Sequence, residues 1–327
     1  MRRKALIVGI NHYDYLPRLY GCVGDASSVA QVLERNEIND EEKNFHVKLM
    51  TCDTSEEAIP RGLLKDAISE LFSGTYEVAL FYFAGHGHVE GTGGYLCGPE
   101  CQRGDDGLPL ADVIAIARKS KSNSKIIVLD SCHSGIAGTS GLAEDTAMIA
   151  NGTTILTAST AEQYALEVNG GGLFTSLFVD ALNGAAANLL GEITPASVYA
   201  HIDQSLGASK QRPVFRTNVQ EFTSLRYVTP PIEKRDLRQL PKLFLAPDML
   251  FPLDPSYEPD LNGRPPNAKA PDPENVRKYQ ILQRCNRVNL VVPVDAPHMW
   301  HAAMNSTGCR LTALGKQYRR LAKDGVF

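Results

Sequence analysis

Two short segments of the sequence hold side chains that are suited to nucleophilic chemistry. The segment FAGHGH (83–88) places His86 between two glycines, and LDSCHSG (129–135) contains Asp130 and Cys132. A thiol and an imidazole form an effective pair for attack on a carbonyl group, because the imidazole takes the thiol proton and the thiolate is the nucleophile. The two segments are therefore candidates for one catalytic site, provided that the fold brings them together.

Each segment follows an apolar run that predicts a buried β-strand. The run before the histidine is VALFYFAG (78–85), and the run before the cysteine is KIIVLD (125–130). In an open α/β sheet, ligands bind beyond the carboxyl ends of the strands. If these two strands are neighbours, His86 and Cys132 meet at that edge of the sheet.

The glycines on either side of the histidine are expected to shape the backbone there. Gly85 and Gly87 would let the backbone approach closely and turn sharply around His86. The backbone N–H groups of Gly87 and Cys132, with that of Gly135, would form an oxyanion hole for the tetrahedral intermediate.

The remaining elements of the first two thirds of the chain alternate between strand and helix. Apolar runs predict further strands at 4–10, 46–52 and 153–159. Helical spacing predicts helices that begin at a capping Asp25, lie within 55–72, and cover 173–184 and 194–206. This alternation predicts a doubly wound, mainly parallel α/β sheet with helices on both faces, over residues 1–228.

The last third of the chain changes in composition. Residues 229–273 contain PP, PLDP, GRPP and APDP, and proline at this density predicts a connector or an extended wrapping segment. Residues 274–327 predict a small, mainly helical unit, with helices at 274–286, 297–305 and 310–323 and a strand at 290–294. This unit has nine Lys and Arg against three Asp and Glu, so its net charge is +6 against −10 for the rest. The excess indicates either an anionic partner or a solvated helix face.

Overall composition places the chain among ordinary globular proteins. Hydrophobic residues make up 43% and charged residues 21%, and no apolar run reaches the ~18–20 residues that span a bilayer. The N-terminal MRRKALIVGI has only a short apolar run and no small-residue cleavage site. Seven scattered cysteines are typical of reduced thiols. We therefore expect a cytoplasmic protein that does not act on membranes.

Together, FAGHGH and the later LDSCHSG resemble the motifs of caspase-like cysteine peptidases, above all metacaspases and their bacterial relatives. LIVGINHYDYLPRLYGCVGDA, TTILTASTAEQYALE and GGLFTSLFVDAL resemble further parts of that family, so the resemblance covers roughly residues 1–228. The 46 positions between His86 and Cys132 are close to the spacing of about 50 in caspases. The resemblance implies a caspase-like fold and a cysteine endopeptidase, with Cys132 as the nucleophile and His86 as the general base.

The resemblance also implies a substrate preference. Metacaspases cleave after Arg or Lys, and the matching acidic positions of the substrate pocket are Asp25 and Asp130. A pair of carboxylates in a partly dry pocket would bind a guanidinium group by bidentate hydrogen bonds and would repel an aspartate. Protein substrates with basic cleavage sites are therefore expected. Asp25 has the alternative interpretation of a plain helix N-cap.

Two metal sites have to be considered beside the peptidase site. Some metacaspases bind calcium through an aspartate cluster, and Asp105 and Asp106 could form part of one. The residues after Gly135 lack the further acid, so we expect that no cofactor is required for the chemistry and that chelation leaves activity intact. Alternatively, Cys97 and Cys101 could bind zinc together with His86 and His88, although the GPE between the cysteines is typical of a turn.

The C-terminal unit is open to three interpretations. Residues 310–323 predict a helix with an apolar face and a basic face. The predicted apolar face contains Leu311, Leu314, Tyr318 and Leu321, and the predicted basic face contains Arg310, Lys316, Arg319, Arg320 and Lys323. The helix could be part of a structural lid, a nucleic-acid reader or a sensor for an anionic nucleotide. In the sensor, Trp300 or Tyr318 would stack on a base, and Arg319 would hold phosphate.

The layout of a catalytic domain, a proline-rich connector and a basic C-terminal unit resembles the caspase-like effectors of Thoeris-type anti-phage defence systems. The resemblance implies a defence protease activated by an NAD-derived or cyclic nucleotide. We do not expect a nucleic-acid partner. Two alternatives remain open at this point. One is a catalytically silent ligand-binding or scaffold protein on a caspase fold, and the other is a protease gated by nucleic acid.

Overall fold

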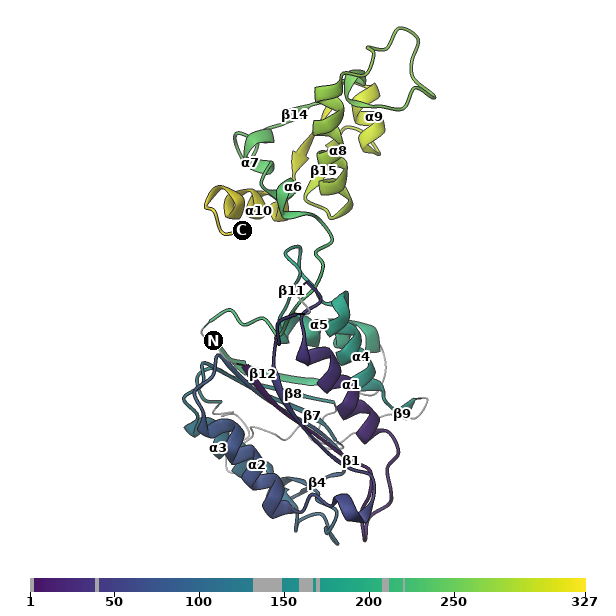
Figure 1. Cartoon of the computed structure of the whole chain (residues 1–327). Helices are drawn as coiled ribbons and strands as arrows, with labels where there is room; N and C mark the ends of the chain where they lie inside the picture. Colours follow the sequence, from purple (N-terminus) through teal and green to yellow (C-terminus); the bar gives the residue numbers. More distant parts are fainter. Residues whose placement is uncertain are drawn as a thin grey trace. The chain divides into compact units, whose positions relative to one another are not determined.

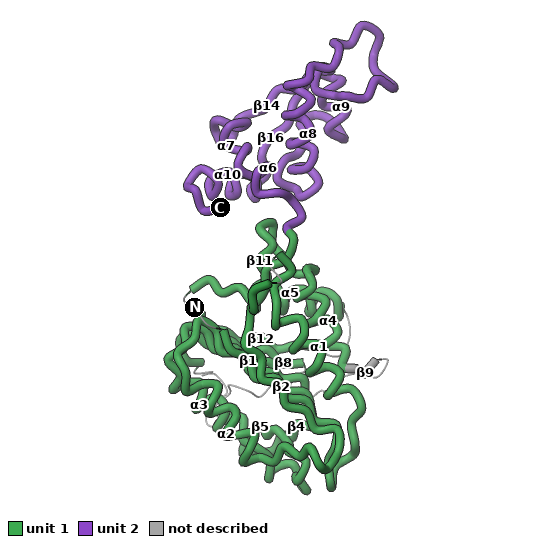
Figure 2. The backbone as a smooth tube through the Cα atoms, viewed as in Figure 1, with its two compact units in different colours: residues 1–229 green, residues 230–327 purple. Residues whose placement is uncertain are grey.

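The computed structural model of the chain describes residues 3–38, 41–131, 149–158, 167–168, 171–207, 212–219 and 221–327 (Figure 1). The chain forms two compact units, residues 1–229 and residues 230–327 (Figure 2). Each unit has its own sheet and is described by itself.

A six-stranded sheet forms the centre of the first unit, with the strand order β12-β8-β7-β3-β1-β2. Its strands are β1 (Arg3–Ile10), β2 (His46–Cys52), β3 (Val78–Ala84), β7 (Ser124–Asp130), β8 (Thr153–Thr157) and β12 (Val214–Asn218). The first five are parallel to one another, as the alternation of strands and helices predicted, and β12 is antiparallel to β8. Strand β12 is not among the predicted strands, because VFRTN has no continuous apolar run.

Helices cover both faces of this sheet, so the predicted doubly wound α/β fold is confirmed (Figure 1). On one face lie α1 (Cys22–Glu34), α4 (Leu173–Asp180) and α5 (Pro195–Leu206), and on the other lie α2 (Arg61–Ser73) and α3 (Leu110–Lys119). Alternate residues of β3 face the two groups of helices. Tyr82 packs with the first group of helices, whereas Phe81 and Phe83 pack with the second.

Smaller elements flank the sheet. They are η1 (Ser55–Glu57), β4 (Gly87–Glu90), β5 (Gly93–Leu96), β6 (Leu108–Pro109), β9 (Glu167–Val168), β10 (Gly171–Gly172), a π-helical turn η3 (Ala181–Ala185), β11 (Glu192–Ile193) and β13 (Arg226–Tyr227). The predicted helix within 55–72 begins only at Arg61, because a residue before proline disfavours helical backbone and Pro60 is the N-cap. The predicted helix 173–184 is regular only to Asp180.

The second unit contains helices around a three-stranded antiparallel sheet with the order β14-β16-β15. Its elements are α6 (Lys234–Leu237), α7 (Leu240–Leu243), β14 (Phe251–Pro252), η4 (Pro255–Tyr257), α8 (Pro273–Arg287), β15 (Val291–Val294), α9 (Met299–Met304), β16 (Gly308–Leu311) and α10 (Ala313–Lys323).

The expected boundaries of the last third differ from those in the structure. From Pro230 onward, the proline-rich stretch belongs to the second unit, because β14 pairs with β16 and Asp236 forms an ion pair with Arg284 of α8. Prolines at helix starts and at the sheet edge are compatible with such packing. The expected helix 310–323 begins at Ala313, since Thr312 caps it and the preceding residues form β16.

Candidate active site

The ends of β3 and β7 lie side by side at the carboxyl edge of the sheet, as the sequence predicted. In the parallel register Ala84 is opposite Asp130, and the Gly85 N–H donates to the Asp130 carbonyl oxygen at 3.4 Å. His86 follows Gly85 directly. Cys132 lies outside the described residues, as does Gly135, so on the β7 side the structure describes the chain up to Ser131.

His86 is held by the loop between β1 and α1. Its Nε2 is 2.7 Å from the carbonyl oxygen of Pro17. A carbonyl oxygen only accepts, so Nε2 carries the proton in this contact, and a neutral ring then has Nδ1 as its basic atom. This orientation prepares His86 to take a proton on Nδ1.

Tyr13, from the same loop, supports the backbone of the histidine. Its hydroxyl accepts a hydrogen bond from the His86 N–H at 2.8 Å, and the two ring centroids are 4.6 Å apart. Burial raises the pKa of Tyr13 well above its ordinary value, so the phenol stays neutral. No sequence motif indicates Tyr13 or Pro17, because only the folded loop brings them to His86.

Close packing, rather than an unusual turn, explains Gly85. A Cβ atom at Gly85 would lie 2.6 Å from the Tyr13 hydroxyl oxygen, so the expected close backbone approach occurs. The expected sharp turn does not need glycine, because neither Gly85 nor Gly87 has a positive φ. Gly87 begins β4 and pairs with Leu96, one residue after the histidine.

The two acidic positions predicted for the substrate pocket lie around Gly172. Asp25 Oδ2 accepts a hydrogen bond from the Gly172 N–H at 2.9 Å. A Cβ atom at Gly172 would lie 2.5 Å from Asp130 Oδ2 and 3.1 Å from Asp25 Oδ2. Both carboxylates therefore border the same point, although 105 positions separate them in the sequence.

The alternative interpretation of Asp25 as a helix N-cap is wrong. Helix α1 begins at Cys22, and Gly21 is its N-cap residue. Asp25 therefore lies within the first turn, where its backbone N–H already bonds to the Gly21 carbonyl oxygen at 2.9 Å. Its side chain is turned to Gly172 instead.

Two buried hydroxyl groups lie behind Asp130. Thr175, in the first turn of α4, has its Oγ1 at 2.6 Å from Asp130 Oδ2, and the Tyr82 hydroxyl is 2.5 Å from the same Oγ1. Burial, followed by the negative charges of Asp130 and Asp25, raises the pKa of Tyr82 well above its ordinary value. Neither Thr175 nor Tyr82 was among the predicted site residues. The available signal was the period of two in β3, which turns Tyr82 away from Phe81 and Phe83.

The residues considered for metal sites have other contacts in the described parts of the chain. Within the described parts of the chain, no three His, Cys, Asp or Glu side chains gather closely enough to hold a metal ion. Cys97 and Cys101 are both buried, and a hydrogen bond with Cys97, together with burial, raises the pKa of Cys101. Asp106 accepts hydrogen bonds from the backbone N–H groups of Gln102 and Gly104, which fix its own loop.

The predicted ligand-binding residues of the second unit have different surroundings. Trp300 is half-buried, with its ring edge-on to His301 at 5.0 Å between centroids. Tyr318 and Arg319 are buried, and Arg319 Nε and Nη2 donate to the carbonyl oxygens of Phe244 and Leu245, each at 2.5 Å. The expected exposure of Arg319 is therefore wrong, because it satisfies carbonyls at the end of α7.

Leu314, which the sequence placed on the apolar face of the same helix, is 43% exposed. Gly315 takes the inward position instead, where a Cβ atom would lie 2.0 Å from the Leu290 carbonyl oxygen. The inner face of α10 is therefore rotated relative to the predicted one.

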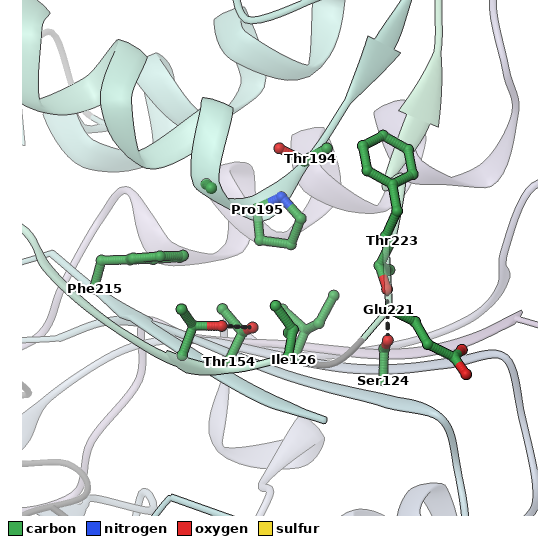
Figure 3. A pocket seen from close by; sticks show the side chains of 12 residues that line it. Ser124, Ile126, Thr154, Thr194, Pro195, Phe215, Glu221 and Thr223 are labelled. Carbon is green, nitrogen blue, oxygen red and sulfur yellow. Dashed lines mark hydrogen bonds between the residues drawn. The ribbon is translucent and has the colours of Figure 1, made fainter. Parts of the chain in front are cut away.

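An open pocket lies elsewhere in the first unit, between the sheet and the start of α5 (Figure 3). Its lining includes Ile126, Phe215 and Pro195, and the Thr154 and Ser124 hydroxyls on its wall are hydrogen-bonded to neighbouring threonines. Ser124 begins β7, whereas Asp130 ends it. The pocket is therefore at the opposite end of the strand from His86, and it is not part of the candidate active site.

The central, mostly parallel sheet with helices on both faces is consistent with the caspase fold. The family model of the caspase domain matches residues 2–223, and the chain belongs to that family. It is therefore a caspase-like cysteine peptidase in general. The crystal structure of protein GSU0716 from Geobacter sulfurreducens has a similar fold, with a TM-score of 0.50 and 16% identity, over 69% of this chain and 97% of that chain. No curated protein matched the sequence.

None of the described helices has the length and apolar character needed to cross a membrane.

Proposed function

We propose that this protein is a cysteine endopeptidase that cleaves peptide bonds after Arg, or Lys, with Cys132 as the nucleophile and His86 as the general base. The observation that carries the proposal is the pair of carboxylates, Asp25 and Asp130, at the same sheet edge as the histidine. Its expected place of action is the cytoplasm.

In the proposed mechanism, His86 Nδ1 accepts the thiol proton of Cys132, and the thiolate attacks the carbonyl carbon of the substrate. The backbone N–H groups of Gly87 and Cys132 stabilise the oxyanion. The imidazolium then gives its proton to the leaving amine, and water hydrolyses the acyl-enzyme. The Pro17 carbonyl, at 2.7 Å from Nε2, would stabilise the imidazolium through the whole cycle.

The preference for a basic residue follows from charge and shape. Two carboxylates that border one point attract a cation and repel an acidic side chain. A planar guanidinium has five N–H donors and can bond both carboxylates at once. Arg is therefore expected to be the better substrate residue.

Fluorogenic peptides with Arg, Lys or Asp before the scissile bond test the proposal, with the wild type, Cys132→Ala and His86→Gln. Cleavage after Arg that both substitutions abolish is the expected result. Cleavage after Asp would overturn the assigned pocket. Lack of cleavage and of rapid alkylation at Cys132 would favour the alternative of a silent scaffold, since an activated thiolate reacts fast near neutral pH.

We further propose that the second unit regulates the peptidase, as in a defence effector activated by an NAD-derived or cyclic nucleotide. The support is the compact unit that follows the peptidase domain. Because Tyr318 and Arg319 are engaged within that unit, the half-buried Trp300 and the exposed Arg320 and Lys323 are the better candidates for ligand contact.

A panel of such nucleotides in the peptide assay, with Trp300→Ala and Arg320→Ala, tests this regulation. Activation by one nucleotide that either substitution weakens is expected. Activation by nucleic acid with a steep salt dependence would favour the nucleic-acid alternative. Full activity without any nucleotide would reduce the second unit to a structural one. A chelator in parallel tests the expected independence from calcium.

A further inference from the structure

We propose that Thr175 is a specificity-determining positioning residue. Its hydroxyl group, oriented by Tyr82, holds the Asp130 carboxylate in the orientation that binds the basic side chain of the substrate. The inference rests on the proposed function, because it assigns a binding role to Asp130. Neither Thr175 nor Tyr82 belongs to the sequence motifs around His86 and Cys132.

The hydrogen bonds between these three residues have one direction. An ionised carboxylate only accepts, so the proton in the 2.6 Å contact between Thr175 Oγ1 and Asp130 Oδ2 belongs to Thr175. A threonine hydroxyl has a single proton, and Tyr82 must therefore donate in its 2.5 Å contact with the same oxygen. The series of hydrogen bonds runs from Tyr82 through Thr175 to Asp130, and each bond polarises the next.

Burial makes this series of hydrogen bonds rigid. The exposed fractions of Tyr82, Thr175 and Asp130 are 0%, 1% and 6%. Tyr82 comes from the middle of β3, where its ring lies near Phe178 of α4, with 6.4 Å between centroids. The β-branched Thr175 has few accessible χ1 angles. Three separate elements thus fix the position of one carboxylate oxygen.

A hydroxyl that only satisfied a buried charge would affect stability and nothing else. The position of Asp130 implies an effect on substrate binding as well. Its Oδ2 also borders Gly172, beside Asp25 Oδ2, so a rotation of the Asp130 carboxylate would alter the pair that receives the substrate cation. Loss of Thr175 should therefore weaken the binding of basic side chains more than that of neutral ones.

The experiment compares two peptides that differ only in Arg or citrulline, its neutral isostere, before the scissile bond. Thr175→Val removes the donor at constant shape and should lower kcat/KM for the Arg peptide by about ten- to a hundredfold, through KM, with a much smaller loss for citrulline. Tyr82→Phe should give a smaller loss of the same kind. Thr175→Ser keeps the donor and should restore most of the Arg preference.

Thr154→Val is the matched control. Thr154 is equally buried and hydrogen-bonded to Thr217, but it lies at the far end of the sheet (Figure 3). It should leave the ratio of the two peptides unchanged. The inference alone would be overturned if Thr175→Val lowered kcat/KM equally for both peptides. It would also be overturned if Thr175→Val did not fold and Tyr82→Phe showed no loss in kcat/KM. A wild type that does not prefer Arg to citrulline would overturn the proposed function and this assignment together.

Discussion

Substitution of Gly172 by alanine tests the arrangement of the two carboxylates directly. The backbone of Gly172 has φ −70° and ψ 126°, which any residue adopts easily, so alanine introduces no backbone strain there. The only obstacle is space. The new Cβ atom would lie 2.5 Å from Asp130 Oδ2, whereas ordinary contact begins at 3.4 Å.

The size of the effect follows from this geometry. Relief of this contact needs a shift of about 0.9 Å between the new Cβ atom and Asp130 Oδ2, which would disturb the 2.6 Å hydrogen bond between Thr175 and Asp130. Misplacement of a binding group by about 1 Å can reduce the rate about a hundredfold. Overpacking of this kind should also lower the free energy of unfolding by about 1–3 kcal/mol.

The assay combines kcat/KM for the Arg peptide with urea denaturation. We expect Gly172→Ala to remain folded, to lose about a hundredfold in kcat/KM, and to lose far less on the citrulline peptide. Gly62→Ala is the control. Gly62 is in α2 with open space around its Cβ position, and alanine there should raise stability by about 0.5–1 kcal/mol without a change in activity. A folded Gly172→Ala protein with wild-type kcat/KM would refute the described pocket.

Three further outcomes are expected. Tyr13→Phe removes the acceptor of the His86 N–H, and steady-state kinetics should show a kcat about tenfold lower at unchanged KM; a change in KM alone would contradict this role. Arg319→Met leaves two carbonyls without donors and should destabilise the second unit by about 2 kcal/mol or more in urea denaturation; an unchanged transition would contradict the contact. Burial raises the pKa of both Cys285 and Cys309 to about 12, so mass spectrometry after alkylation at pH 7.5 should find both unmodified in the folded protein; rapid labelling of either would contradict their burial.

The sequence predicted the parts of the site that belong to regular elements. Strands β3 and β7 are continuous apolar runs, and parallel pairing brings the residues after them to one edge, so the neighbourhood of His86 and Asp130 could be inferred. Tyr13 and Pro17 could not, because they reach His86 through a loop whose path no local pattern encodes. The continuous apolar run of β3 indicates a buried Tyr82, but its hydroxyl partner comes from a helix 93 positions later.

The second unit was predicted less well, for a different reason. Proline density indicates where regular structure is interrupted, but it does not show whether the segment packs. In the structure Phe251 pairs with Cys309, and Asp236 meets Arg284, so contacts distant in sequence decide the fold of this stretch. The same holds for α10. Its charge predicted an exposed Arg319, but the residue is buried because it donates hydrogen bonds to two backbone carbonyl oxygens.

The hydrogen bond between Asp25 and Gly172 spans 147 positions of the chain. During synthesis, a ribosome finishes the helix that carries Asp25 and the strand that carries Asp130 well before it adds the residue that joins them. An unfinished chain that ends before Gly172 has the proposed acidic pair without the backbone amide that holds Asp25. The proposed pocket for a basic side chain would therefore be complete only after the ribosome has added Gly172, at about the middle of the 327-residue sequence.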